Sequence, residues 1–582
     1  MSLEKIDFVV SFKEPKAHYV EVEMTLVGLT AGAVDLKMPA WTPGSYLIRE
    51  FARHVEQLTA SDEHHRRIDV EKTEKNTWRL INPSNTTIVR YKIYGFERSV
   101  RTNFIDESHA FLSSAATFLY VAQHLHLPAT VKVMLPENWS KISTGLIPLP
   151  DQKNTYCAEN FDILYDSPLE IGNQDTWTFD AAGIPHEFAM VGTAEYDKER
   201  LSKDIRKIVE VETEIWGTNP NDYYLFITHN YQNAHGGLEH LNSTVLATSR
   251  DNYQSTSGYT NFLSLIAHEY FHLWHVKRLR PDALGPFDYE QENYTRLLWI
   301  FEGFTAYYDN LIIRRCGFFN EEEYLAALAT DFNVVLNRPG HQVQSAAQAS
   351  FDAWIKHYRP DENSPNTSIS YYNKGAMLAA ILDIYILAMT DGRKRLDQVL
   401  QAAYNQYYII ENRGVAETEF QELAEQVSGV SLHAIFTAAH DTEDLDYNAY
   451  FNLVGYQLID DNAGNTAPSI GMKCISQDGR LIVKSVERDS AAWEDGLNVD
   501  DEIIAFDRLR VDPDGRELDA LLKRRQVGDH IEFLISRDGL IREIPVRLKP
   551  NRKTSYSIER NPAATAAEKR LGQLWLSLNE TK

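Results

Sequence analysis

The chain has 582 residues, enough for several domains with extensive cores, and 43% of them are hydrophobic, which is typical of a globular protein rather than a disordered one. Its formal net charge of −25 at pH 7 argues against binding to nucleic acid or anionic membranes. Most of this charge fits a soluble acidic surface, although it would also suit a cationic group such as a peptide N-terminus. The three cysteines are far apart and odd in number, so neither a disulfide framework nor a cysteine zinc site is predicted.

No segment of the sequence predicts secretion or membrane insertion. The first residues include acidic side chains and no apolar stretch of signal-peptide length. The longest apolar run, 376–389, is short for a membrane span and contains Asp383, so it predicts a buried helix. We therefore expect a cytoplasmic protein.

Residues 1–180 predict a β-rich N-terminal domain. From Val20 to Leu26, apolar and polar residues alternate, the pattern of a strand with one solvated face. Segments 89–94 and 131–135 look similar. The segment Pro39–Tyr46 is rich in aromatic residues and glycine, and it could either line a cleft or pack as a loop between strands.

After residue 180 the pattern changes to mixed helix and strand. An amphipathic helix is predicted over 201–216 and a short strand over 224–228. Gly236 and Gly237 follow, and glycines let a substrate backbone approach closely. Glu239 comes next and could pair with an α-ammonium group. The competing interpretation, which the residues alone favour, is a Gly-Gly turn followed by an exposed glutamate.

The central motif is His268-Glu269-Tyr270-Phe271-His272. Residues four apart on a helix share one face, so His268 and His272 can bind one Zn²⁺ between them. Glu269 is then placed to act as a general base. We expect the helix to begin near Thr260 or Asn261, and Pro281 limits its length.

Two histidines leave a catalytic zinc site incomplete, because such sites usually have three protein ligands. A third histidine ten positions after the first is excluded, because that position holds Arg278. The better candidate is Glu302, on a helix predicted from about Asn293 to Cys316 and closed by Gly317. Its surroundings are apolar, so a buried acid there needs a partner such as a metal. His275 shares the face of the two histidines, and we expect it to pack or support them rather than to bind the metal.

Residues 336–455 predict a mostly helical domain, with helices over 376–389, 396–408, 418–427 and 432–440, the third begun by a capping box of Thr418 and Gln421. Tyr372 precedes the first of these helices. Its hydroxyl could donate a hydrogen bond to a developing oxyanion. The chemistry alone favours a packing tyrosine at a helix start.

Residues 456–550 have the element order of a PDZ domain. The backbone of 470–472 would then accept a peptide C-terminal carboxylate, while a packing or gating role is about equally open. Residues 551–582 predict a polar tail with apolar residues near its end.

Together these stretches resemble the glycyl aminopeptidase-type zinc metallopeptidases, which are related to aminopeptidase N. The matching stretches follow the family's order along nearly the whole chain: 39–46, 236–240, 268–281, 302–308, 372–375 and the PDZ-like segment. The resemblance implies a multidomain α+β fold, with an N-terminal β-sheet domain (1–180), a thermolysin-like zinc catalytic domain (181–335), an α-helical domain (336–455), a C-terminal PDZ domain (456–550) and a tail (551–582).

The resemblance also implies roles for individual residues. One Zn²⁺ per chain would be bound by His268, His272 and Glu302, with Glu269 as the general base. Gly236, Gly237 and Glu239 match the family's exopeptidase motif, so Glu239 would hold the free amine, and Tyr372 matches the tyrosine that stabilises the oxyanion. The preferred first residues would be small, chiefly Gly and Ala.

The sequence departs from the family's pattern at two places. His275 stands where the family usually has Asn, which puts the surroundings of the metal ligands in doubt. The aminopeptidase N relatives place the glutamate ligand closer to the second histidine, at the position of Gln291 with Glu292 beside it. We keep Glu302, because its Glu-Gly-Phe-Thr context fits the glycyl branch, with Glu292 in reserve.

The main hypothesis is a zinc aminopeptidase acting on peptides with a free N-terminus and small first residues. The alternative is a zinc endopeptidase whose PDZ domain recruits substrate C-termini. A third hypothesis is a peptide-binding protein that keeps zinc only for stability. Glu269 argues against it, because a structural zinc site needs no base.

Overall fold

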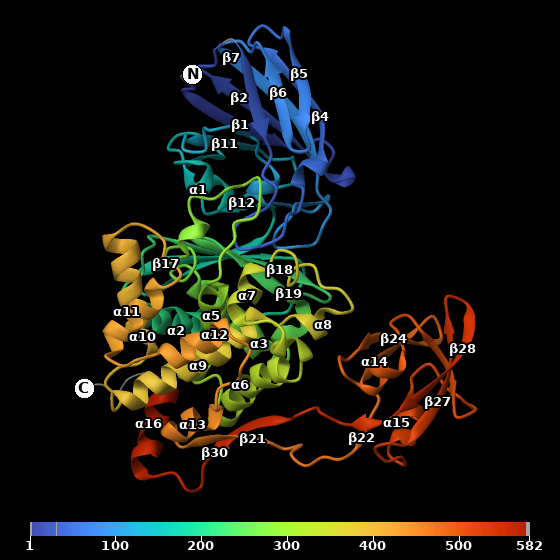
Figure 1. Cartoon of the computed structure of the whole chain (residues 1–582). Coiled ribbons are helices and arrows are strands. Elements are labelled where there is room, and N and C mark those ends of the chain that lie inside the picture. The colour runs from blue at the N-terminus through green and yellow to red at the C-terminus, as the bar shows by residue number, and fades with distance from the viewer. Residues whose placement is uncertain (1–2, 31, 578–582) are drawn as a thin grey trace. The chain divides into compact units, whose positions relative to one another are not determined.

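The computed structural model describes residues 3–30 and 32–577 (Figure 1). The chain forms two compact units. The first unit comprises residues 1–295, 308–319 and 400–416, and the second comprises residues 296–307, 320–399 and 417–582.

The first unit begins with a large sheet in the strand order β10-β3-β6-β5-β4-β7-β2-β1-β11-β14-β13. The alternation predicted for Val20 to Leu26 forms β2 (Tyr19–Val27), which pairs with β1 (Lys5–Ser11) and β7 (Thr86–Tyr94) and turns its apolar side chains into the core. The other strands are β3 (Ala33–Lys37), β4 (Val55–Asp62), β5 (Arg67–Glu74), β6 (Thr77–Ile81), β10 (Tyr120–Val121), β11 (Ala129–Met134), β13 (Ile147–Pro148) and β14 (Thr155–Ala158).

A smaller antiparallel sheet follows in the order β12-β15-β9-β8. Its strands are β8 (Phe104–Ile105), β9 (Ala110–Leu112), β12 (Lys141–Thr144) and β15 (Leu169–Gly172). Helix α1 (Phe161–Tyr165) belongs to the same region and is capped by the Asn160 side chain.

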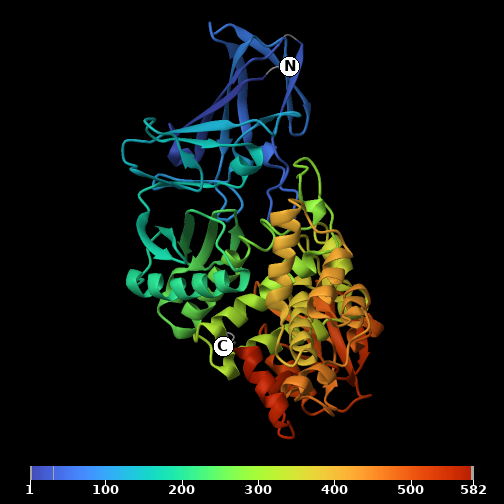
Figure 2. The ribbon, with the colours of Figure 1, turned by 90° about the vertical axis from the view of Figure 1, so that its left-hand side faces the viewer.

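The third sheet of this unit is mixed, in the order β16-β17-β18-β20-β19. Its middle strands are parallel and its two outer strands antiparallel, so β19 is an edge strand. The strands are β16 (Asp175–Ala181), β17 (Ile184–Val191), β18 (Tyr224–Tyr231), β19 (His235–Glu239) and β20 (Ser243–Ser249). Helices α2 (Lys198–Trp216) and α3 (Thr256–Phe271) pack on each other and cover one face of this sheet (Figure 2).

Helix α3 carries the His-Glu-Tyr-Phe-His motif, but it begins earlier than expected. Its N-cap is Ser255, whose side chain accepts a hydrogen bond from the Gly258 amide. The prediction of Thr260 or Asn261 as the start was wrong, because Ser255 already satisfies the first turn and the Thr260 hydroxyl donates to the Thr256 carbonyl within the helix. The helix ends at Phe271, and His272 is its C-cap residue.

The helix predicted from Asn293 to Cys316 is instead two helices, α4 (Leu298–Phe301) and α5 (Gly303–Arg315), with Glu302 at the break. The beginning was placed too early, because the Asn293 side chain is held by the preceding loop, where its amide donates to the Asp288 carbonyl. The end was predicted correctly, since Gly317 adopts the positive φ of 78° that a helix-ending glycine favours.

The second unit contains the helical domain. Its helices are α6 (Glu321–Leu336), α7 (Ala346–Phe351), α8 (Ser364–Thr367), α9 (Tyr371–Met389), α11 (Glu419–Ser428), α12 (His433–His440) and α13 (Tyr447–Phe451). The helix predicted over 396–408 is α10 (Leu396–Ala403), which continues as π-helical turns. The predicted capping box at Thr418 does not form, because the Gln421 amide donates to Glu425 instead.

Helix α9 contains the long apolar run. Among the described residues it is the one helix long and apolar enough to cross a membrane, and 72% of that window is buried inside the protein, as in a core helix. Its buried Asp383 is fully paired, because it accepts hydrogen bonds from the Arg395 guanidinium (2.9 Å), the Leu396 amide (2.9 Å) and the Tyr307 hydroxyl (2.8 Å).

The PDZ domain lies in the same unit. Its sheet has the order β23-β24-β25-β27-β28, with β26 pairing β25. The elements are β23 (Met472–Gln477), β24 (Arg480–Val486), α14 (Ala491–Asp495), β25 (Glu502–Phe506), β26 (Leu509–Arg510), α15 (Arg516–Leu522), β27 (His530–Arg537) and β28 (Leu540–Arg547). Short strands β22 (Pro468–Ser469) and β29 (Lys549–Pro550) pair where the chain enters and leaves the domain.

The predicted polar tail contains regular secondary structure. After the PDZ domain, β30 (Tyr556–Arg560) pairs with β21 (Tyr456–Asp460), and α16 (Ala566–Leu576) follows. The apolar residues near the end are core residues, since Trp575 is fully buried and its indole N–H donates to the Tyr307 hydroxyl at 2.8 Å. Residues 578–582 lie outside the described part of the chain.

Candidate active site

The two histidines at the end of α3 face each other through their Nε2 atoms, which are 3.2 Å apart. The His272 Nδ1 lies 2.7 Å from the His275 carbonyl, and the His268 Nδ1 lies 3.1 Å from an Asp309 carboxylate oxygen. A carbonyl can only accept, so the His272 Nδ1 carries the proton and its Nε2 keeps a lone pair. Histidines that bind metals are held in this way through their second nitrogen. Two converging Nε2 atoms therefore fit a cation between them.

His275 supports this pair through its backbone. The imidazole is fully buried beside the Trp216 and Phe271 rings, and burial holds its pKa well below the usual value. The atom that holds His272 is the carbonyl of residue 275, and any residue at that position supplies one. The departure from the family's Asn therefore leaves this contact intact.

Asp309 is a residue of the site that the sequence interpretation missed. It lies on α5, and the stacking of Tyr308 on Phe271, with ring centroids 4.9 Å apart, fixes this part of α5 against α3. The one sequence signal was its spacing, because seven residues from Glu302 would be about two turns of a continuous helix. The helix is broken at Glu302, so this spacing alone does not identify Asp309.

The general-base candidate, Glu269, is pressed against strand β19. A Cβ atom added to Gly237 would lie 2.2 Å from the Glu269 Oε1, so this strand position has room only for glycine. Glu269 is 5% exposed, and its Oε2 has no hydrogen-bond partner among the described residues. Burial raises the pKa of Glu269 to about 7, while the nearby charge of His268 opposes that rise.

Glu239 lies on the same strand, two residues after Gly237. It is 4% exposed, so the interpretation as an exposed glutamate was wrong. A Cβ atom on Gly44 would lie 2.5 Å from the Glu239 Oε1, and Gly44 has a positive φ of 80°. The loop 39–46 thus lies against Glu239. The Oε1 atom has no hydrogen-bond partner within 3–30 and 32–577, so the carboxylate retains the capacity to bind a cation.

Glu302 and Tyr372 come together within the second unit. A Cβ atom on Gly303 would lie 2.5 Å from the Gly375 Cα, so the start of α5 and the first turn of α9 touch through two glycines. Glu302 is 2% exposed. Burial, and then the Glu302 charge, raise the pKa of Tyr372 well above its usual value, so its hydroxyl stays protonated and can donate.

Lys374, two residues after Tyr372 on α9, has a structural role. Lys374 is buried, and its ammonium donates to an Asp444 carboxylate oxygen (3.2 Å) and to the Tyr447 hydroxyl (3.0 Å). The lysine therefore anchors the first turn of α9, which carries Tyr372.

Comparison with known families identifies the chain. The M61 peptidase N-terminal domain matches residues 7–173, the M61 glycyl aminopeptidase domain matches residues 261–378, and a PDZ domain matches residues 468–548. The three domains match in the order that the resemblance implied. The predicted resemblance and the predicted multidomain fold class are both confirmed, and this protein is a peptidase.

A solved structure from Idiomarina loihiensis, described as an aminopeptidase N family protein, is similar over the whole length. The two share 29% identity at a TM-score of 0.90, covering 98% of this chain and 100% of the other. No protein with a curated description matches the chain.

Two more distant structures are also similar. An M1 zinc metallopeptidase of Deinococcus radiodurans is 14% identical (TM-score 0.49, 76% of this chain and 94% of the other). Legionella pneumophila aminopeptidase A is 14% identical (TM-score 0.48, 84% and 55%).

In the described part of the chain, two groups of side chains could hold a metal ion. One is His268, His272 and Glu302, and the other is His109, Glu170 and His229. Glu292, the reserve ligand, is in neither group.

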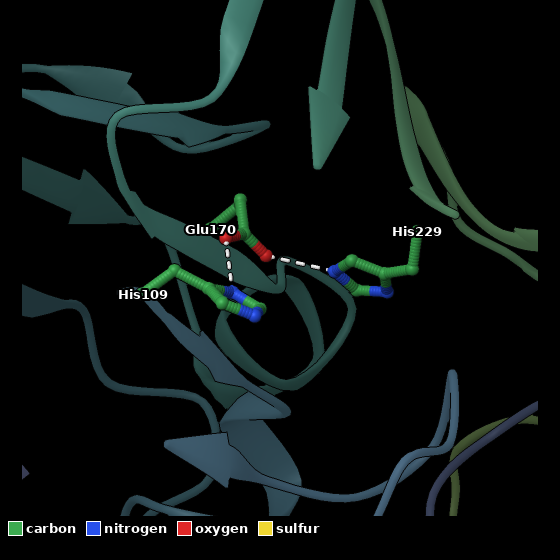
Figure 3. A group of neighbouring side chains, drawn as sticks. All are labelled: His109, Glu170 and His229. Carbon is green, nitrogen blue, oxygen red and sulfur yellow. Dashed lines mark hydrogen bonds and ion pairs between the residues drawn. The ribbon is translucent and has the colours of Figure 1, made fainter. Parts of the chain in front are cut away.

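The second group joins the small sheet, through Glu170, to the third sheet, through His229 on β18 (Figure 3). Glu170 on β15 is fully buried, and its two oxygens lie 2.8 Å from the His109 Nδ1 and 2.8 Å from the His229 Nε2. The rings on either side therefore bond directly to the carboxylate. The His229 Nδ1 is buried and has no hydrogen-bond partner among the described residues.

Proposed function

We propose that this chain is a zinc aminopeptidase that removes small N-terminal residues, Gly and Ala, from peptides. One Zn²⁺ would be held by His268, His272 and Glu302. The donor set supports this, because two imidazole nitrogens and one carboxylate are usual ligands of catalytic zinc. A bound zinc supplies Lewis-acid activation of a water and of the substrate carbonyl.

The observation that carries the proposal is a pair of carboxylates on one face of strand β19, at Gly237 and two residues further on. Glu239 lies on the same edge strand, and the side chain of Glu269 presses against the Gly237 backbone. A free amine bound by Glu239 then leaves the first peptide carbonyl beside Glu269. This arrangement supports cleavage after the first residue.

In the proposed mechanism, Glu239 binds the substrate ammonium through a charge-assisted hydrogen bond. Glu269 accepts a proton from the attacking water and later delivers it to the leaving amine. Tyr372 donates its hydroxyl hydrogen to the oxyanion that develops on the carbonyl. The loss of such a donor typically costs about 3 kcal/mol of transition-state stabilisation.

The preference for a small first residue is supported by the loop 39–46. The Gly44 backbone lies against both Glu239 and Leu238, which limits the space on that side of the amine site. The endopeptidase alternative has no contact of this kind in its favour, because an internal peptide segment has no ammonium for Glu239.

The test is hydrolysis of glycyl-, alanyl-, leucyl- and N-acetylglycyl-anilides by the zinc-loaded protein. We expect cleavage of the free glycyl and alanyl compounds, slower cleavage of the leucyl compound and none of the acetylated one. The Glu239→Gln variant should lose most of its activity towards free amines through a higher KM. Equal cleavage of glycyl- and N-acetylglycyl-anilides would overturn the aminopeptidase assignment in favour of an endopeptidase.

A further inference from the structure

Arg101 approaches strand β19 from the segment between β7 and β8. Its Nη2 donates to the Gly237 carbonyl at 3.0 Å. Gly237 is also the residue against which Glu269 is pressed. The guanidinium therefore lies beside the proposed base.

The hydrogen-bond pattern of β19 shows which side of the strand Arg101 occupies. The His240 amide donates to the Ser243 carbonyl at 2.9 Å, so these two residues are a hydrogen-bonded pair of the β19–β20 ladder. Hydrogen-bonded and non-hydrogen-bonded pairs alternate along an antiparallel ladder. Glu239 and Gly237 precede His240 by one and three residues, so both belong to non-hydrogen-bonded pairs. Their backbone N–H and C=O groups therefore point away from β20, towards the open edge. Arg101 thus bonds to the edge along which an extended substrate would lie.

Arg101 has hydrogen-bonding capacity left. Its Nε is buried and has no hydrogen-bond partner in the part of the chain that the structure describes. The side chain also lines a cavity of about 450 Å³, with Arg98, His235 and Gly236 among the other lining residues. A guanidinium with free N–H groups at the wall of a cavity can form a bidentate pair with a carboxylate.

The spacing along β19 indicates which carboxylate Arg101 could bind. Residues two apart on a strand, such as Glu239 and Gly237, are separated by about 6.8 Å. An extended dipeptide spans a similar length. A substrate whose amine is held by Glu239 therefore brings its second residue to the level of Gly237 and Arg101.

We propose that Arg101 binds the C-terminal carboxylate of a dipeptide whose amine is held by Glu239, which makes dipeptides with free ends the preferred substrates. The inference rests on the proposed aminopeptidase function. The site would then match both charges of a zwitterionic dipeptide, with a carboxylate for its ammonium and a guanidinium for its carboxylate.

The test compares kcat/KM for glycyl-alanine, which ends in a carboxylate, with that for glycyl-alaninamide, which does not. Charge-assisted hydrogen bonds lead us to expect that the wild type cleaves the free acid about 10- to 100-fold faster. Arg101→Gln should remove most of that preference, and Arg101→Lys should retain part of it. Glycyl-anilide, which has no carboxylate, reports the basal activity in every variant.

The matched control is Arg98→Gln. Arg98 lines the same cavity but stacks over the Phe104 and Tyr231 rings, and it should keep the preference for the free acid. Equal rates for acid and amide in the wild type, or a preference unchanged in Arg101→Gln, would overturn the inference while glycyl-anilide is still cleaved. Failure to cleave glycyl-anilide would instead overturn the proposed function.

Discussion

Two groups in the first unit each combine two histidines with one carboxylate, but the carboxylate has a different position in each. On α3, the carboxylate of Asp309 lies behind the His268 ring, at its Nδ1, and the Nε2 atoms of His268 and His272 converge. In the other group, the carboxylate of Glu170 lies between two rings and bonds to each directly (Figure 3). In the α3 group the two Nε2 lone pairs point at one place, where a cation could bind. In the Glu170 group one nitrogen of each ring is already hydrogen-bonded to the carboxylate.

The comparison indicates how a metal site can be told from a hydrogen-bonded histidine–carboxylate group. The distinguishing feature is whether the second ring nitrogen, the one that faces away from the centre of the group, has a hydrogen-bond acceptor. On α3, both remote nitrogens have acceptors, as metal-binding histidines usually do. The His229 Nδ1 has no hydrogen-bond partner among the described residues. We therefore expect His109, Glu170 and His229 to hold the small sheet to the third sheet through shared protons. We expect His268 and His272 to hold the metal.

The largest effect should come from Glu269→Gln, which keeps the shape of the site and removes the base. General-base catalysis typically contributes about 10²- to 10⁴-fold, and we expect a loss of kcat in this range with zinc content unchanged. Steady-state kinetics and metal analysis of the same preparation measure both. Unchanged activity would revive the hypothesis of a peptide-binding protein that keeps zinc for stability.

Gly237→Ala should be the next most damaging change. The new Cβ would lie 2.2 Å from the Glu269 Oε1, and a displacement of about 1 Å can cost around 10²-fold in rate. The matched control is Gly145→Ala, whose Cβ would lie 2.2 Å from the Asn242 Oδ1, outside the site. Equal activity of the two variants would show that Glu269 tolerates displacement.

Asp309→Ala sharpens the comparison between the two groups, because it removes the acceptor behind His268. Such changes typically weaken metal affinity or activity about 10- to 100-fold, and zinc titration against a competing chelator measures the affinity. The control is Asp204→Ala, which removes a carboxylate that accepts from the Tyr259 hydroxyl of α3 at 3.0 Å. Equal zinc affinity in both variants would mean that Asp309 does not orient His268.

His109→Gln should have the smallest effect, on stability alone. Burial opposes the charged imidazole, but the Glu170 carboxylate outweighs it and raises the pKa of His109. Glu170 is buried as well, and the His109 charge nevertheless lowers the pKa of Glu170. The His109 contribution is complete below the unfolded pKa of about 6.5 and is lost as the pH rises through the folded pKa, whereas the Glu170 contribution is lost on acidification below about pH 4.3.

Urea unfolding should therefore show a cost of about 1–3 kcal/mol for His109→Gln at pH 6 and a smaller cost at pH 9. His126→Gln, at an exposed histidine, is the control and should show little cost at either pH. A cost that does not change with pH would mean that His109 is not protonated when it bonds to Glu170.

Much of the fold could be predicted from the sequence, because period-two patterns mark strands such as β2 and the motif residues mark α3. Asp309 could not be identified in advance, since its role depends on how α5 packs against α3. The break at Glu302 was also missed, because the contact between Gly303 and Gly375 joins segments far apart in the chain. The burial of Glu239 depends on Gly44, almost 200 residues earlier.

The most direct test of the central claim is the zinc content of three proteins: the wild type, His272→Ala and His229→Ala. We predict about one zinc per chain in the wild type and in His229→Ala, and close to none in His272→Ala. Two zinc ions in the wild type with one lost in His229→Ala, or an unchanged content in His272→Ala, would contradict the assignment of the metal to the α3 pair.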